Sequence, residues 1–80
     1  MNQFAQTLVV QIGKLKGPFR GLSNYQPRFT FANGVTWRQN ELKYLYFYAG
    51  NPRARVMYKN GAYFLDVDGS EEMVEVIKEA

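Results

Sequence analysis

Two Asn-Gly dipeptides, Asn33-Gly34 and Asn60-Gly61, each lie between short runs of aromatic and β-branched residues. Asn and Gly tolerate the positive φ angles that tight β-turns require, so this arrangement is a strong hairpin signal. The chain has 80 residues, enough for one domain with one small core. Six Phe, six Tyr and one Trp supply the bulk that such a core needs. The sequence therefore predicts a single all-β domain over residues 1–80, with residues 1–6 flexible.

Strands are expected where apolar and β-branched residues run between turn signals. The first covers residues 8–15 and ends at Gly17-Pro18, because proline cannot donate to a ladder. After a short stretch at 19–22, further strands are expected at residues 28–31, 35–40, 53–59 and 62–67. Residues 42–48 are the most apolar segment and fit either a strand or a helix. In the acidic tail we expect one turn at 70–72, with a short helical turn as an option, followed by a closing strand at 73–78.

The first hairpin has two registers to choose from. A two-residue turn would place Phe29 and Phe31 on the face opposite Trp37 and would expose large apolar side chains. A three-residue loop over 32–34, with its glycine in the left-handed conformation as a G1 bulge, instead pairs Phe31 with Val35 and Phe29 with Trp37. This register puts all four side chains on one face. We therefore predict the bulged loop and a tryptophan in the core.

The second hairpin fits a tight, primed two-residue turn directly. This register pairs Tyr58 with Tyr63, Val56 with Leu65, and Arg55 with Asp66 as a complementary charge pair. It also places Met57 opposite Phe64 on the other face. Both faces of the hairpin then carry large apolar side chains, so one face needs a cover. The candidates are residues 42–48 and a second protein chain.

Charge is strongly segregated along the chain. Residues 1–60 hold nine of the ten Lys and Arg residues and one acid, a net charge of +8, whereas residues 61–80 hold one Lys and six acids, a net charge of −5. We expect the acidic strands to lie beside the basic ones and neutralise them. The alternative is a basic face for an anionic partner.

The sequence lacks the residue types on which several kinds of catalysis and metal binding depend. The chain contains neither histidine nor cysteine, the usual bases, nucleophiles and zinc ligands. Asp66, Asp68 and Glu71 do not have calcium-loop spacing. We therefore expect no enzyme activity, no cofactor, no metal and no small-molecule substrate. Membrane insertion is not expected either, because no apolar run approaches the roughly 20 residues that span a bilayer.

Two classes of function remain. The leading expectation is a protein-interaction or self-association module, because the second hairpin carries more apolar side chains than one small core should absorb. The alternative is nucleic-acid binding, in which exposed aromatic side chains stack on bases inside a cationic groove. Trp37 and about half of the tyrosines are expected in the core. The candidate binding residues are Arg38, Lys43, Tyr44, Tyr46, Tyr48, Arg53, Arg55, Met57 and Phe64.

The segment 29–39, FTFANGVTWRQ, together with Ile12-Gly13-Lys14 and Phe19-Arg20-Gly21, resembles a group of small bacterial domains with an N-G-x-x-W-x-Q motif. The likeness covers residues 8–40 well and residues 56–69 more loosely. It implies an SH3-like antiparallel barrel of five or six strands built from hairpins, and it implies no catalytic residue. Many members of the group follow signal peptides, which leaves an envelope location open. A cytoplasmic location is also open, since a chain without cysteine is compatible with a reducing compartment.

Overall fold

The computed structural model describes residues 7–25 and 27–79, and the expected flexibility of residues 1–6 lies outside them. The described chain is all-β, as expected, and contains no helix. Its eight strands are β1 (Leu8–Lys14), β2 (Pro18–Phe19), β3 (Arg28–Thr30), β4 (Thr36–Gln39), β5 (Ala49–Gly50), β6 (Arg53–Lys59), β7 (Ala62–Val67) and β8 (Val74–Lys78).

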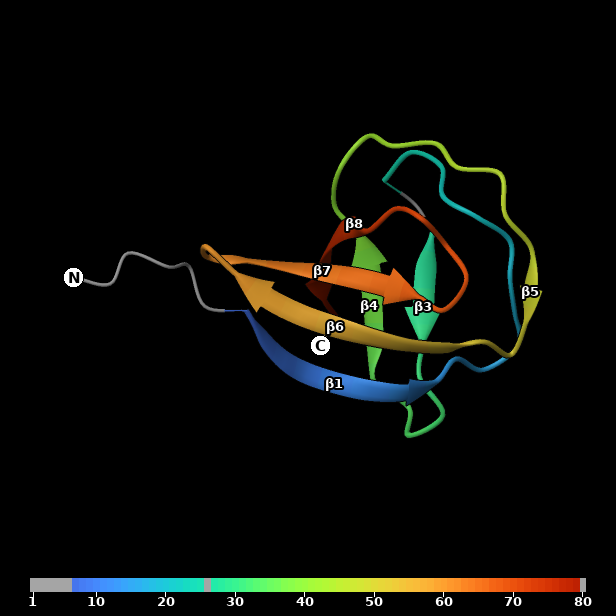
Figure 1. Ribbon diagram of the computed structural model, residues 1–80, viewed down its shortest axis with the longest axis horizontal. Coiled ribbons are helices and arrows are strands. Elements are labelled where there is room, and N and C mark those ends of the chain that lie inside the picture. The colour runs from blue at the N-terminus through green and yellow to red at the C-terminus, as the bar shows by residue number, and fades with distance from the viewer. Residues whose placement is uncertain (1–6, 26, 80) are drawn as a thin grey trace.

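Six of the strands form one antiparallel sheet in the order β1-β6-β7-β8-β4-β3, and β2 pairs with β5 in a second, two-stranded sheet. Figure 1 shows the long strands β1, β6 and β7 side by side, with the shorter β8, β4 and β3 crossing them steeply. The buried side chains fill the space between these two groups, with Phe31, Val56, Leu65 and Val74 the most deeply enclosed. The strongly bent sheet thus forms both walls of the core.

The first hairpin has the predicted bulged register. Phe29 pairs with Trp37, and the Phe31 N–H donates to the Val35 carbonyl at 2.9 Å. The Gly34 N–H donates to the Phe31 carbonyl at 2.8 Å, and Gly34 has a φ of 95°. Phe29, Phe31 and Trp37 are all buried. The extra loop residue therefore brings the tryptophan onto the core face.

The second hairpin also has the predicted register: Tyr58 opposes Tyr63, Val56 opposes Leu65, Met57 opposes Phe64 and Arg55 opposes Asp66. Asn60 and Gly61 have φ angles of 53° and 83°, as a primed turn requires. Val56, Leu65 and Val67 are buried, whereas Met57 and Phe64 lie half-buried on the opposite face. We call that opposite face of β1, β6 and β7 the outer face.

Residues 42–48, which we call the strap, are neither helix nor strand apart from one bridge between Leu45 and Leu22. The Phe47 ring packs 6.0 Å from the Phe19 ring. A Cβ atom at Gly21 would lie 2.2 Å from the Leu45 carbonyl oxygen, so only glycine permits this approach. The strap therefore packs beside Phe19 and Leu22. Leu45 and Phe47 face the core there, so the strap, one of the two candidate covers, does not place its apolar side chains over Met57 and Phe64.

The strap begins beside a buried polar side chain. The Gln39 amide group donates to the Glu41 and Lys43 carbonyls at 3.0 and 2.9 Å, and its oxygen accepts from the Ser23 N–H at 3.2 Å. Gln39 is fully buried, so an unsatisfied amide would be costly there. Its three bonds hold the start of the strap against the loop that follows β2.

The sheet is not closed into a continuous barrel, in contrast to the expected five- to six-stranded barrel. Its edge strands β1 and β3 meet only after both have ended, at a bridge between Leu15 and Phe31. The Lys16 N–H donates to the Thr30 carbonyl and the Ala32 N–H to the Lys14 carbonyl, both at 2.8 Å. The physical reason is length: β3 has three residues and β1 has seven, so most of β1 has no neighbour on that side.

The acidic tail contains the expected turn and closing strand. The Glu72 N–H donates to the Ser70 hydroxyl at 3.3 Å, and β8 then pairs with both β7 and β4. The optional helical turn is not formed. No helix of membrane-spanning length and apolarity occurs in residues 7–25 or 27–79.

Candidate interaction surfaces

Three of the predicted basic site residues are engaged by carboxylates. Arg38 lies 3.2 Å from Glu79, Arg55 lies 3.1 Å from Asp66, and Lys43 lies 3.5 Å from Glu72 and 3.8 Å from Glu41. The Lys43 amine also donates to the Met73 carbonyl at 2.6 Å. The acidic tail thus neutralises basic strands, as the charge pattern predicted, and these three cations are less available to an anionic partner.

Glu79 joins two arginines from adjacent strands. The Arg28 guanidinium donates to one carboxylate oxygen at 2.6 Å, and the Arg38 guanidinium donates to the other at 3.2 Å. The hydrogen bond from Arg28 lowers the pKa of Glu79 below its ordinary value of 4.5, and the positive charges of both arginines act in the same direction. Partial burial opposes this shift without reversing it.

Other cations have no carboxylate within ion-pair distance in the part of the chain that the structure describes. Besides the predicted Arg53, they include Lys14, Lys16, Arg20 and Lys59. Lys14 and Arg53 lie directly opposite one another on β1 and β6, a like-charge pair without an acid in ion-pair contact among the described residues. Lys16 and Arg20 are not among the site residues predicted from the sequence, because they are remote in sequence from the strap tyrosines beside which the fold places Arg20.

The strap presents its tyrosines to solvent. Tyr44, Tyr46 and Tyr48 are 68%, 103% and 67% exposed, while Leu45 and Phe47 between them pack against the core. Trp37, by contrast, is a core residue whose indole N–H donates to the Gln11 side-chain oxygen at 3.0 Å. The three strap tyrosines are therefore the most exposed aromatic side chains among the described residues, ahead of Tyr25 at 50% and Tyr63 at 36%.

Two neighbouring hollows share Arg20. The first, the aromatic hollow, has a volume of about 340 Å³ and is lined by Arg20, Tyr46, Phe47 and Tyr48. In it the Arg20 guanidinium carbon lies 5.9 Å from the centre of the Tyr48 ring, within cation–π range.

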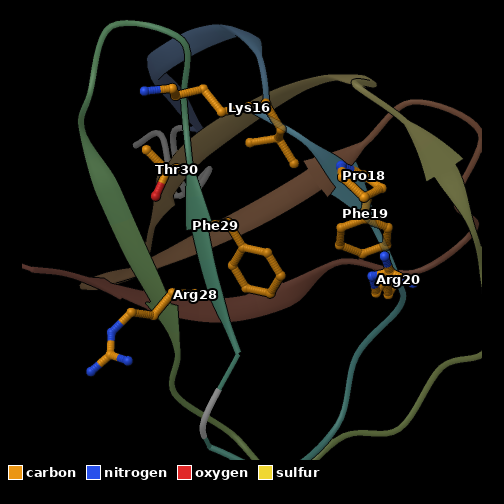
Figure 2. Close-up of a pocket in the computed structure, with 8 residues that line it drawn as sticks. Lys16, Pro18, Phe19, Arg20, Arg28, Phe29 and Thr30 are labelled. Atoms are coloured by element: carbon orange, nitrogen blue, oxygen red, sulfur yellow. The ribbon is translucent and has the colours of Figure 1, made fainter.

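The second, the basic hollow, has a volume of about 170 Å³. Figure 2 shows the rings of Phe19 and Phe29 at its centre with Arg20 beside Phe19, and the charged ends of Lys16 and Arg28 at its margin, directed away from the rings. Leu15, Pro18 and Thr30 complete its lining.

The outer face carries an apolar row. Val9, Met57 and Phe64 are aligned across β1, β6 and β7 by the strand register. Val9 is 52% exposed, and Met57 and Phe64 are half-buried. Met73, 41% exposed, lines a hollow together with Phe64 and Ala62. The predicted residues Met57 and Phe64 are thus brought together, but away from the strap tyrosines.

The apolar row runs into an open sheet edge. β1 ends the six-stranded sheet, and its apolar side chains Leu8, Val9, Val10 and Ile12 are all about half-exposed or more. A bulge between Val9 and Gln11 inserts Val10 as an extra residue. Val9 and Ile12 therefore both lie on the outer face, opposite Met57 and Arg55 respectively.

Comparisons with known proteins identify no relative for this chain: no protein-family model, no curated protein and no solved structure matches it significantly. No cluster of three or more acidic residues suited to holding a metal ion occurs in residues 7–25 and 27–79. The surfaces described above are therefore interpreted from their own chemistry.

Proposed function

We propose that this protein is a non-enzymatic interaction module that self-associates through the open edge of β1. The single observation that carries the proposal is the exposed apolar character of that edge, which continues into the apolar row. An unpaired strand edge offers its backbone N–H and C=O groups to a further strand. An edge that is long and apolar, without protecting charges over residues 8–12, favours such pairing.

A second copy of the chain can pair with this edge so that the apolar side chains of both copies lie on the same face of the extended sheet. The bridge between Leu15 and Phe31 occupies the end of the β1 edge, and among the described residues no further strand pairs with the backbone of residues 8–13 on that side. In an antiparallel pair centred between Val10 and Gln11, Val9 lies opposite Ile12 of the second copy. Paired residues of antiparallel strands share a face, and both of these side chains are on the outer face. The twofold relation makes this contact twice and joins the two apolar rows.

The charges agree with the same register. It brings Lys14 opposite Thr7 of the second copy, so no lysine faces a lysine across the interface. A parallel pairing in register would instead align the Lys14 residues of both copies. Charge therefore favours the antiparallel arrangement.

We also assign the domain, as part of this proposal, to the SH3-like barrels. Support comes from the bent antiparallel sheet, and from the hydrogen bonds around Leu15 and Phe31 that join its two ends. In this interpretation the short β3 leaves the barrel partly open, and the open part of β1 becomes the association edge.

Sedimentation velocity over about a hundredfold range of protein concentration tests the proposal. The average mass of the sedimenting wild-type protein should rise with concentration towards that of a dimer. Val9→Lys should abolish this rise, because lysine on an edge strand disfavours pairing. Ile77→Lys is the matched control, since Ile77 is an exposed apolar residue on β8, away from the β1 edge. A wild-type protein that stays monomeric throughout, or two lysine variants that behave alike, would contradict the proposal.

A further inference from the structure

We infer that the two hollows joined at Arg20 form a binding site for single-stranded nucleic acid, with a base in the aromatic hollow and its phosphate in the basic hollow. This goes beyond the proposed function and uses a different part of the molecule. In Figure 1 the strap and β5 lie on the opposite side from the β6–β7 turn, where the β1 edge begins.

The aromatic hollow supplies the surface for stacking. Tyr46 is fully exposed and Tyr48 is two-thirds exposed, and both line a hollow with Phe47 at its side. Bases of any sequence stack on such side chains, and the loss of one aromatic platform lowers affinity by about tenfold. Arg20, which lies against the Tyr48 ring, adds a planar cation at the same position.

The basic hollow supplies the charge for the phosphate. Lys16 and Arg20 have no carboxylate within ion-pair distance among the described residues, whereas Arg28 is held by Glu79. Three of the four cations predicted from the sequence, Arg38, Lys43 and Arg55, are each paired with an acid, whereas the fourth, Arg53, lies on β6 and lines neither hollow. Available cations and exposed aromatic side chains therefore coincide at Arg20.

Nearby acidic residues indicate on which side of Tyr46 the phosphate of the bound nucleotide lies. Glu71 and Glu72 line a separate hollow together with Leu45, Tyr46 and Phe47. A phosphate on that side of Tyr46 would meet the carboxylate of Glu71, which is unpaired among the described residues, beside a Glu72 whose charge is balanced by Lys43. Repulsion there and attraction at Arg20 direct the phosphate chain towards the basic hollow.

The strap is positioned before any ligand binds. Backbone hydrogen bonds join Leu22 and Leu45 in both directions, at 2.9 and 3.0 Å, and Gln39 holds the residues where the strap begins. A platform that is already ordered costs less conformational entropy on binding. The strap thus presents Tyr46 and Tyr48 on fixed backbone.

Fluorescence anisotropy with a labelled oligothymidylate of about 12 nucleotides tests this inference, at about 50 mM and about 200 mM salt. We expect binding that weakens steeply with salt, and a loss of about tenfold in affinity for Tyr46→Ala and for Arg20→Ala. The matched controls are Tyr25→Ala, an exposed tyrosine that lines neither hollow, and Lys59→Ala, a cation on the β6–β7 hairpin. Both should bind like the wild-type protein, and all four should keep the wild-type circular dichroism spectrum.

Two further probes separate stacking from charge alone. An abasic oligonucleotide of the same length should bind about tenfold more weakly, and thymidine monophosphate at the same nucleotide concentration should compete poorly. No binding at low salt, equal binding of the abasic strand, or full competition by the mononucleotide would each overturn the inference. The variant Val9→Lys should retain oligonucleotide binding, so failure here is distinguishable from failure of the self-association proposal.

Discussion

Phe29 and Trp37 lie directly opposite one another across the first hairpin, both buried, because the loop between their strands contains three residues. A loop shorter by one residue would turn the indole ring to the opposite face. Gly34 makes the longer loop feasible, since its φ of 95° lies in the left-handed region. One loop residue therefore decides whether the largest side chain of the chain is core or surface.

Gly34→Val should lower the free energy of unfolding by about 1 to 2 kcal/mol. A Cβ atom at Gly34 would meet no atom within 4 Å, so the cost comes from the backbone conformation alone. Gly50→Val is the control, because that site is equally open but has no positive φ. Urea unfolding should show a clear loss for the first variant and a much smaller change for the second; equal changes would argue against the bulge.

Trp37→Ala should cost about 3 to 5 kcal/mol and leave the domain largely unfolded. The substitution removes a buried ring whose centre lies 5.2 Å from that of Tyr63. It also removes the indole N–H that donates to the Gln11 side-chain oxygen. Near-ultraviolet circular dichroism and amide NMR dispersion report the loss of packing. Tyr44→Ala, at an exposed aromatic position, should leave both signals intact. A folded Trp37→Ala protein would show that the first hairpin has the other register.

Gly21→Ala should destabilise the protein more than Gly17→Ala. Both glycines have positive φ angles, of 96° and 74°, so the backbone cost is similar. Only at Gly21 would the new Cβ meet the Leu45 carbonyl oxygen, at 2.2 Å. The difference between the two midpoints of urea unfolding therefore measures how tightly the strap is docked. Equal midpoints would mean that the strap moves aside at no cost.

Acid should remove the stabilisation that Glu79 provides. Because its pKa in the folded protein lies below the ordinary 4.5, the contribution is fully present above that value. It is lost as the pH falls below 4.5 and through the lowered folded pKa. In urea unfolding at pH 7 and pH 3, Glu79→Gln should lose less stability on acidification than the wild-type protein. Glu71→Gln, at an exposed acid without an ion pair among the described residues, should follow the wild-type protein.

The hairpins could be predicted because their determinants are local. Side-chain alternation combined with the turn chemistry of Gly34 and Gly61 leaves one register that buries the apolar residues. The conformation of the strap depends on contacts remote in sequence, from Gly21 and from the amide of Gln39, which no local pattern reveals. For the same reason Arg20 was not predicted as a site residue, since only the folded chain brings it beside Tyr48.

Disulfide cross-linking tests the proposed β1 pairing most directly, because the chain has no cysteine of its own. In the antiparallel register, residue 9 of one copy faces residue 12 of the other, within the Cα separation of about 4.4 to 6.8 Å that a disulfide spans. Identical residues of the two copies lie three positions out of register, about 10 Å apart. Val9→Cys and Ile12→Cys proteins, mixed and oxidised, should therefore give a covalent dimer that neither gives alone. No dimer in the mixture, or equal amounts of dimer from each variant alone, would contradict self-association through β1.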